Sequence, residues 1–133
     1  MSRRISGRVC DVLLLICAVP IVVFCRLISP ILLVRFGRLY NARLGHFVFD
    51  TSYFLASQQE QSAREERKSI DLFFLEGQSA NLFFEALARK HLRIHDFVRY
   101  CFFANSKIPL GDKHIICMPL EHSGSRDYDG ALN

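Results

Sequence analysis

The sequence has no tryptophan, only two methionines and no paired-cysteine motif. Its five cysteines never occur as C-x-x-C, the spacing typical of zinc-binding and redox sites. A P-loop, a G-x-G-x-x-G motif and a Ser-His-Asp spacing are also missing. We therefore expect no metal and no cofactor. We interpret the cysteines as small apolar residues of a chain in a reducing, cytoplasmic setting.

Acidic residues are scarce in the first part of the chain. Residues 1–50 contain seven Arg and two Asp, a balance of +5, whereas residues 51–133 contain ten basic and eleven acidic residues, a balance of −1. Cations beside an apolar segment are attracted to anionic lipid headgroups. No stripe of basic and aromatic residues follows downstream, so we expect membrane lipids as partners and no nucleic acid.

Charged residues are missing from a long apolar run near the N-terminus, Val12–Cys25. After Arg26 the apolar residues resume, and a single helix over Val12–Val34 would measure about 35 Å, enough to cross a bilayer. Arg26 inside such a span would cost about 2.5–3.5 kcal/mol unless it reached the surface. Pro20 and Pro30 would each remove a helix hydrogen bond. We predict a membrane anchor over residues 1–34.

The anchor has two candidate geometries. One is a plain spanning helix, and the other is a re-entrant or interfacial helix pair, bent near Pro20 or Ser29-Pro30, with both ends cytoplasmic. Arginines flank the apolar run on both sides, so the positive-inside rule does not choose an orientation. A cleaved signal peptide and a buried core helix are further interpretations of the same residues.

Elements of a soluble part follow the apolar run. Asp50, Thr51 and Ser52 are N-cap types that predict a helix over residues 52–66. Residues 70–75, IDLFFL, predict a buried strand. After a glycine-containing loop, Asn81 is placed to cap an amphipathic helix that runs to about residue 92.

Further along, residues 97–103 and 114–118 predict two more strands, with a turn at 109–112. Residues 46–49 fit either a strand or a first helical turn. Strands that alternate with helices predict an α/β fold with a mostly parallel sheet over residues 35–133. A parallel sheet needs both faces covered, and two helices cover little, so we expect the front part of a larger fold.

The candidate chemistry lies where a strand meets a helix. Gly45 would let backbone N–H groups approach a phosphate at a helix N-terminus. His46 is placed to act as a base on an acceptor hydroxyl, although a simple turn with His46 packed at a loop edge fits the same residues. Arg38 and Arg43 fit either a diphosphate or the membrane surface.

Two other groups of polar residues have plainer interpretations. His91 and His95 have an i, i+4 spacing that can bind a metal, but HLRIH lacks the Glu of H-E-x-x-H, and a solvated helix face fits better. The tail contains polar residues after a predicted strand, where α/β sheets bind ligands, and an exposed tail fits them equally. These tail residues are His122, Arg126, Asp127 and Asp129.

Several segments carry a resemblance to a bacterial glycosyltransferase family associated with surface-polysaccharide synthesis. They are residues 26–30, 34–39, 43–47 and 50–55, the run IDLFFLEGQSAN at 70–81, and Arg126-Asp127. The most characteristic segment resembles the motif R-[IL]-G-H-F and lies at 43–47. The resemblance extends over residues 26–133, about a third of the length of family members.

The resemblance implies an architecture of two facing Rossmann-like halves, of which this chain would contain the N-terminal one. It implies His46 as the catalytic residue. It implies substrate contacts from six residues: Arg43, Gly45, Ser79, Asn81, Arg126 and Asp127. A nucleotide-sugar or glycan acceptor would be the ligand, and a separate C-terminal half would be a partner.

The sequence therefore favours a membrane-associated glycosyltransferase portion at the bacterial inner membrane, with its soluble part on the cytoplasmic face. A second hypothesis is a non-catalytic, membrane-anchored binding or scaffold protein. A third is a sugar-phosphate transferase that acts on a polyprenyl carrier, suggested by Asp11 ahead of an apolar helix that contains proline.

Overall fold

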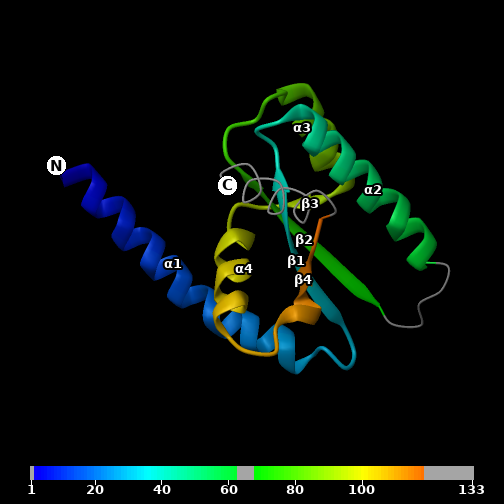
Figure 1. Cartoon of the computed structure of the whole chain (residues 1–133). Coiled ribbons are helices and arrows are strands. Elements are labelled where there is room, and N and C mark those ends of the chain that lie inside the picture. The colour runs from blue at the N-terminus through cyan, green and yellow to red at the C-terminus, as the bar shows by residue number, and fades with distance from the viewer. Residues whose placement is uncertain (1, 63–67, 119–133) are drawn as a thin grey trace, which may run out of the picture.

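A computed structural model describes residues 2–62 and 68–118, with side chains described from residue 8 to residue 60 and from residue 68. Within these ranges the chain is an α/β fold with a parallel sheet (Figure 1). The helices are α1 (Ser2–Leu27), α2 (Leu44–Ser62), α3 (Leu82–His91) and α4 (Val98–Lys107), with a 3-10 turn η1 (Asp112–His114). The strands are β1 (Leu33–Tyr40), β2 (Ser69–Glu76), β3 (Arg93–Ile94) and β4 (Ile115–Ile116).

The sheet has the strand order β3-β2-β1-β4, and every neighbouring pair is parallel. The two long strands pair in register from Leu33 opposite Ser69 to Tyr40 opposite Glu76. Because the strands are parallel, the loops that follow them meet at one edge of the sheet. We call this the carboxyl edge.

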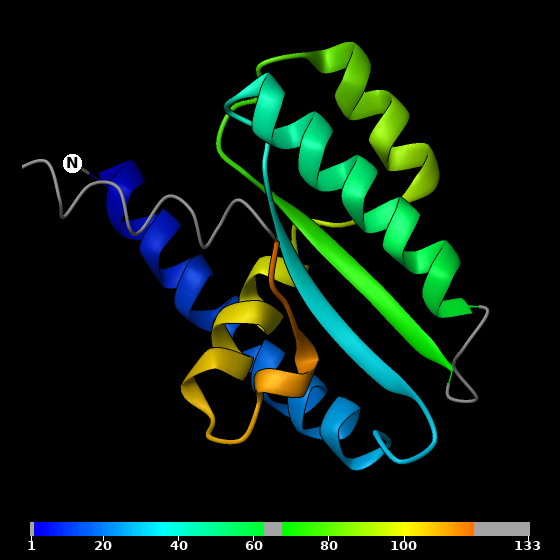
Figure 2. The same cartoon turned by 45° about the vertical axis from the view of Figure 1, so that its right-hand side comes forward.

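Helices cover both faces of the sheet, with α2 and α3 on one side and α1 and α4 on the other (Figure 2). Alternate residues of β1 point to opposite layers, as the pleat of a strand requires. Val34 and Phe36 pack in the α1/α4 layer, whereas Leu39 packs in the α2/α3 layer. Both layers therefore draw on the same central strands for their cores.

Gly37 lies in the middle of β1, where the chain has no room for a side chain. A Cβ at this position would collide with the ring of Phe73 and lie 3.3 Å from Cβ of Ile116. The glycine lets the aromatic core of the α2/α3 layer lie directly on the backbone of the central strand.

The structure confirms the parallel α/β fold and much of its order. The predicted strand at 70–75 is β2, the predicted helix after Asn81 is α3, and the predicted strand at 114–118 contains β4. Residues 46–49 lie in α2, so the helical alternative for this run holds, and the helix begins eight residues before position 52.

One predicted strand is wrong, and so is the alternative of a single helix over Val12–Val34. Residues 97–103 are not a strand but belong mostly to α4, because the buried residues of this segment recur at helical spacing: Val98, Cys101, Ala104 and Asn105. The apolar N-terminal run also does not continue as a helix to residue 34. It ends at Leu27, a turn follows, and Leu33 begins β1.

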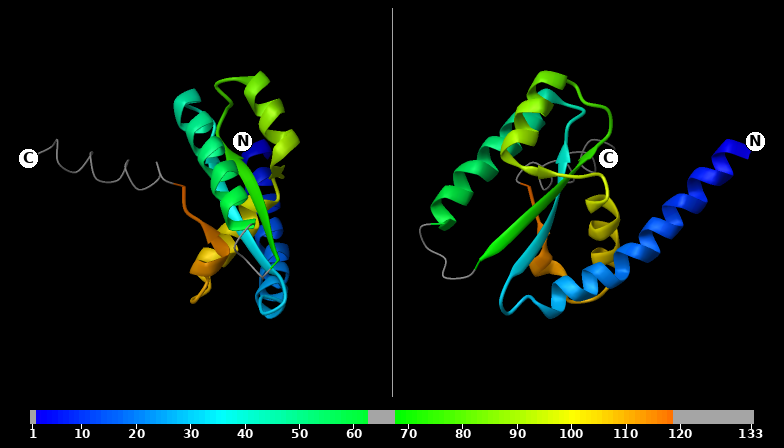
Figure 3. Two further views of the ribbon diagram at one scale, coloured as in Figure 1. Left: turned by 90° about the vertical axis from the view of Figure 1, so that its right-hand side faces the viewer. Right: turned by 180° about the vertical axis from the view of Figure 1, so that it is seen from behind.

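Helix α1 runs without interruption through Pro20, and its N-terminal half projects away from the sheet (Figures 1 and 3). The segment Arg8–Leu27 is long and apolar enough to cross a membrane, and only 11% of it is buried. Length and composition of this kind also occur in signal sequences and in core helices of soluble proteins.

Candidate functional site

The loops after β1 and β2 are joined at the carboxyl edge. The side chain of Asn41, directly after β1, donates through Nδ2 to the Gly77 carbonyl over 3.3 Å. The Asn41 carbonyl accepts from the backbone N–H of Ala80 over 2.9 Å. The two loops therefore form one unit that positions the first turns of α2 and α3.

Three of the predicted site residues lie at the start of α2. Arg43 and Gly45 are exposed, and His46 is half-buried. The carbonyl of Arg43 accepts from the Phe47 N–H over 3.0 Å, so the helix begins here. The first N–H groups of a helix have no partner within it, and they favour an anion in front of them.

Gly45 is not a turn residue and is not required by packing. Its φ is not positive, and a Cβ at this position would meet nothing within 4 Å. The space beside the first turn of α2 is therefore open. The interpretation of Gly45 as a turn is wrong, whereas a backbone open to a ligand agrees with the geometry.

The two predicted residues of the second loop have structural tasks. Asn81 Oδ1 accepts from the backbone N–H of Phe84 over 3.0 Å and so caps α3. The Ser79 hydroxyl donates to the Asn81 carbonyl over 3.3 Å. Both residues lie at the carboxyl edge, but the Asn81 side chain is already engaged by its own helix.

The remaining predicted contacts, Arg126 and Asp127, lie outside the described residues, as do His122 and Asp129. Arg38, which was expected to bind a diphosphate or the membrane surface, instead faces Glu76, with Nε 3.3 Å from Oε2. Its guanidinium also lies 4.7 Å from the ring centre of Tyr40. A carboxylate on the neighbouring strand thus already occupies this arginine.

Asn41 is a candidate that sequence reasoning missed. It is 1% exposed, and its Oδ1 has no hydrogen-bond partner within the described part of the chain. A buried acceptor without a donor costs about 1–3 kcal/mol, so a ligand hydroxyl or water at this place would be favoured. An Asn directly after a strand is the signal, and it was hidden because β1 itself was not predicted.

A cavity of about 410 Å³ lies on the other face of β2 near the same edge. It is lined by Phe74, Leu75, Gly77, Asp96, Arg99 and Tyr100. The Tyr100 hydroxyl donates to Asp11 Oδ1 of α1 over 2.7 Å, and this bond raises the pKa of Tyr100. The cavity wall is therefore tied to the apolar N-terminal helix.

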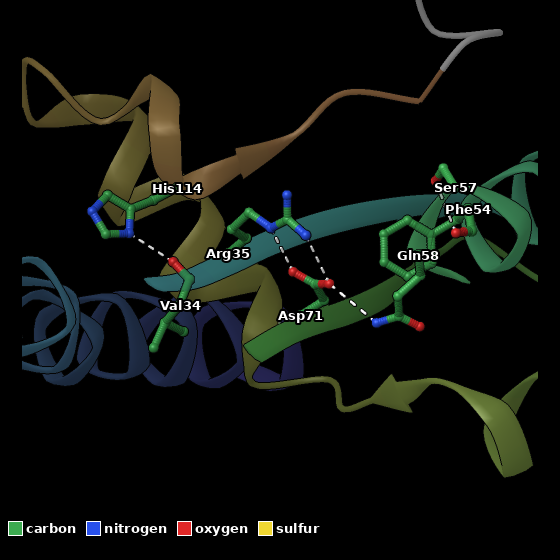
Figure 4. A network of polar contacts seen from close by, with 7 residues as sticks. All are labelled: Val34, Arg35, Phe54, Ser57, Gln58, Asp71 and His114. Carbon is green, nitrogen blue, oxygen red and sulfur yellow. Dashed lines mark hydrogen bonds and ion pairs between the residues drawn. The ribbon is translucent and has the colours of Figure 1, made fainter. Parts of the chain in front are cut away.

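A larger cavity, about 520 Å³, lies farther from the carboxyl edge, along β3. One of its lining residues, Asp71, belongs to a buried polar network (Figure 4). Arg35 donates to both Asp71 oxygens over 2.6 and 3.0 Å, and Gln58 of α2 donates over 3.4 Å. These bonds link β1, β2 and α2, so we assign the network to the fold.

His114 belongs to the same region (Figure 4) and contacts the backbone of β1. Its Nδ1 lies 2.6 Å from the Val34 carbonyl, so this nitrogen carries the proton. The contact holds η1 against the start of β1, far from the carboxyl edge. His114 therefore has a structural task.

The two histidines at i, i+4 do not share a helix face. His91 is the last residue of α3, and His95 follows β3. No group of three or more His, Cys, Asp or Glu side chains suited to a metal ion occurs among residues 2–62 and 68–118.

No family model, no curated protein and no solved structure matches the chain.

Proposed function

We propose that the chain is the N-terminal, acceptor-facing portion of a membrane-associated glycosyltransferase that uses a nucleotide-sugar donor in surface-polysaccharide synthesis. The observation that carries the proposal is the position of residues 43–47. This segment, which resembles the family motif, opens α2 directly after the central strand β1. It lies at the carboxyl edge, the place where parallel α/β sheets bind ligands.

The sheet order supports a Rossmann-like half. β3-β2-β1-β4 matches the first four strands of the doubly wound order, which reverses direction beside the first strand. In such sheets the ligand lies outside the strand ends at the reversal, here between β1 and β4. The loop after β1 contains Asn41 and Arg43, so polar groups stand at the proposed crevice.

Each residue has a proposed part in the chemistry. Arg43 and the free N–H groups of the first turn of α2 bind an anionic group of the acceptor. Asn41 Oδ1 accepts from a sugar hydroxyl. His46 removes the proton from the attacking hydroxyl as the new glycosidic bond forms and the nucleotide leaves the donor sugar. A C-terminal half supplies the donor site.

Membrane association places this site near a lipid-linked acceptor. Much of α1 exposes large apolar side chains, a surface that soluble proteins rarely leave uncovered. The nucleotide-sugar donor is cytoplasmic, so the soluble part lies on the cytoplasmic face of the inner membrane.

The test is binding of an acceptor analogue to the full chain. A short-chain polyprenyl diphosphate glycan is titrated into the protein in detergent, and the Kd is measured by calorimetry. We expect Arg43→Ala and His46→Asn to weaken binding by about tenfold or more, which is about 1.4 kcal/mol. The matched control is His95→Asn, an exposed histidine on the loop after β3. Equal Kd values for all variants, or no binding, contradict the proposal.

The second candidate is a non-catalytic, membrane-anchored scaffold. It is favoured by Arg38 and Asn81, whose side chains are engaged within the fold. A scaffold binds neither donor nor acceptor, and His46→Asn leaves its partner binding unchanged. Capture of a C-terminal glycosyltransferase half by both wild type and His46→Asn, without acceptor binding, is the result that favours it.

A further inference from the structure

Helix α1 divides into two faces from Arg8, where its described side chains begin, to Leu27. One stripe of residues recurs at intervals of three or four: Arg8, Asp11, Leu15, Ala18, Val22 and Cys25. Ala18, Val22 and Cys25 are buried against α4, in one cluster with Cys101 and Ala104. Asp11 of the same stripe accepts from Tyr100 of α4. This stripe, which we call the seam, faces the sheet domain.

The face opposite the seam is apolar and exposed. Its large side chains are Val9, Val12, Leu13, Ile16, Val19, Ile21, Val23, Phe24 and Leu27. Leu13 is 56% exposed and Phe24 is 61% exposed, although they lie three turns apart. The charged residues described on the helix, Arg8, Asp11 and Arg26, all point away from the middle of this face, as the 100° turn per residue requires.

Arg26 fixes the far end of the helix to the domain. Its guanidinium donates to Asn105 Oδ1 over 2.8 and 3.0 Å and to the carbonyls of Ile108 and Pro109 over 2.9 and 2.7 Å. These carbonyls follow the C-terminal end of α4, where a cation also favours the helix dipole. Gly111 leaves room for the contact, since a Cβ there would collide with the guanidinium.

The seam excludes a spanning helix in this arrangement. The apolar packing between α1 and α4 begins at about Leu15, and α4 exposes Arg99, Ser106 and Lys107. A bilayer around Leu15–Leu27 would therefore have to take up the polar surface of α4. The seven residues from Arg8 to Leu14 extend only about 10 Å, a third of the apolar thickness of a bilayer.

We propose that α1 lies along the surface of an anionic bilayer, with the face opposite the seam immersed and both helix ends on the same side. The occupant of this face is lipid, because Arg3, Arg4 and Arg8 add positive charge at one end of the apolar surface. The proposal rests on the membrane association proposed above and adds its geometry. It makes the domain a one-sided membrane protein.

The decisive measurement is the depth of two residues on the immersed face. Leu13→Cys and Phe24→Cys are made in a full chain that also carries Cys10→Ser, Cys17→Ser and Cys117→Ser, the exposed cysteines. Cys25 and Cys101 are buried, so both native thiols are shielded from the label. A nitrobenzoxadiazole label is placed on each new cysteine and quenched by spin-labelled lipids in phosphatidylglycerol/phosphatidylethanolamine proteoliposomes.

We expect the two labels at the same depth, about 5–10 Å below the headgroups. A spanning helix instead separates them by about 16 Å, the rise of eleven residues. That separation overturns the one-sided arrangement and leaves membrane association intact.

A second measurement uses the sides of the membrane. Ser2→Cys and Ser106→Cys, in the same background, are exposed to an impermeant maleimide in inverted inner-membrane vesicles and in intact spheroplasts. We expect both to react in inverted vesicles and neither in spheroplasts. Reaction of the two from opposite sides overturns the inference alone. A chain recovered entirely in the aqueous fraction overturns the membrane association as well.

Discussion

The α2/α3 layer and the contact between α1 and α4 are built from different residues. The α2/α3 layer contains packed aromatic rings. The ring centres of Phe47 and Phe84 are 4.9 Å apart and those of Phe54 and Phe73 are 4.7 Å apart, both in edge-on contacts. Where the seam of α1 meets α4, small residues pack together: Ala18 and Cys25 lie in one cluster with Cys101 and Ala104. Small side chains let two helices approach closely, whereas aromatic rings bury a large apolar area. The two contacts therefore differ in how they are packed, by aromatic rings in one and by small side chains in the other.

Removal of an aromatic ring from the α2/α3 layer is expected to cause the largest loss of stability. Phe47→Ala removes a ring that is fully buried beside Phe84, and we expect a loss of about 3–5 kcal/mol in the free energy of unfolding. Phe49→Ala, two residues away and half exposed, is the control, with a loss below about 1 kcal/mol. Denaturant titration followed by circular dichroism measures both. Similar losses would show that the layer does not draw its stability from ring burial.

The next largest loss of stability is expected from the buried ion pair of the same layer, Arg35–Asp71. Asp71→Asn leaves Arg35 without its charge partner, and we expect a loss of about 3 kcal/mol. Glu85→Gln breaks the exposed pair with Arg89 and is expected to cost about 0.5 kcal/mol. The double variant Arg35→Gln with Asp71→Asn completes the cycle. A cost for Asp71→Asn no larger than that of Glu85→Gln would contradict a structural role for the network.

In the seam we expect the reverse sensitivity, to larger rather than smaller side chains. Ala18→Leu adds volume where α1 meets Cys101 and Ala104, and overpacking costs about 1–3 kcal/mol. Val19→Leu on the exposed face is the matched control and is expected to change stability by less than about 0.5 kcal/mol. Thermal unfolding in detergent measures both. Equal stability of the two variants would mean that the seam is not closely packed.

Alkaline pH tests the seam through its buried thiol. Burial raises the pKa of Cys101 from 9.0 to about 11, so the unfolded chain loses this proton first. The stabilisation that the protonated thiol gives to the folded state is complete below pH 9 and is lost as the pH rises to about 11. The free energy of unfolding is expected to decrease by about 2 kcal/mol over this range. In Cys101→Ala the free energy of unfolding is expected to depend less on pH between about pH 9 and 11. Cys117→Ala, which removes an exposed thiol, is expected to leave this pH dependence unchanged. An unchanged slope in Cys101→Ala would contradict the assignment.

The elements that sequence reasoning found are those whose signals are local. Asn81 is placed to cap α3, and IDLFFL has the composition of a buried strand, so both could be predicted. β1 could not, because Arg35 and Arg38 interrupt its apolar residues, and their partners Asp71 and Glu76 come from a strand 36 and 38 positions away. The helical face of α4 was obscured by adjacent aromatic residues, which also have strand preference.

The same reason explains the candidate site. Gly45 and His46 were predicted from a segment that resembles a family motif. Asn41 could not be predicted because it depends on β1, and Asp96 and Arg99 follow the two-residue strand β3. Such short strands exist only through pairing with β2, and no local pattern encodes them. Arg26 was placed in a span, but its partners are 79 to 83 residues away. Long-range contacts thus account for what the sequence alone did not reveal.

The glycine within β1 and the glycine in the first turn of α2 provide the smallest and sharpest test. Gly37→Ala must displace the Phe73 ring, and we expect a loss of about 1–3 kcal/mol. Gly45→Ala meets open space in the first turn of α2, so we expect stability to stay equal or to rise by about 0.5 kcal/mol. If an anion binds in front of this turn, the same methyl group hinders its approach, and acceptor affinity falls about tenfold while stability does not. Loss of affinity without loss of stability separates a binding glycine from a packing glycine, and unchanged affinity in Gly45→Ala would remove the first turn of α2 from the proposed site.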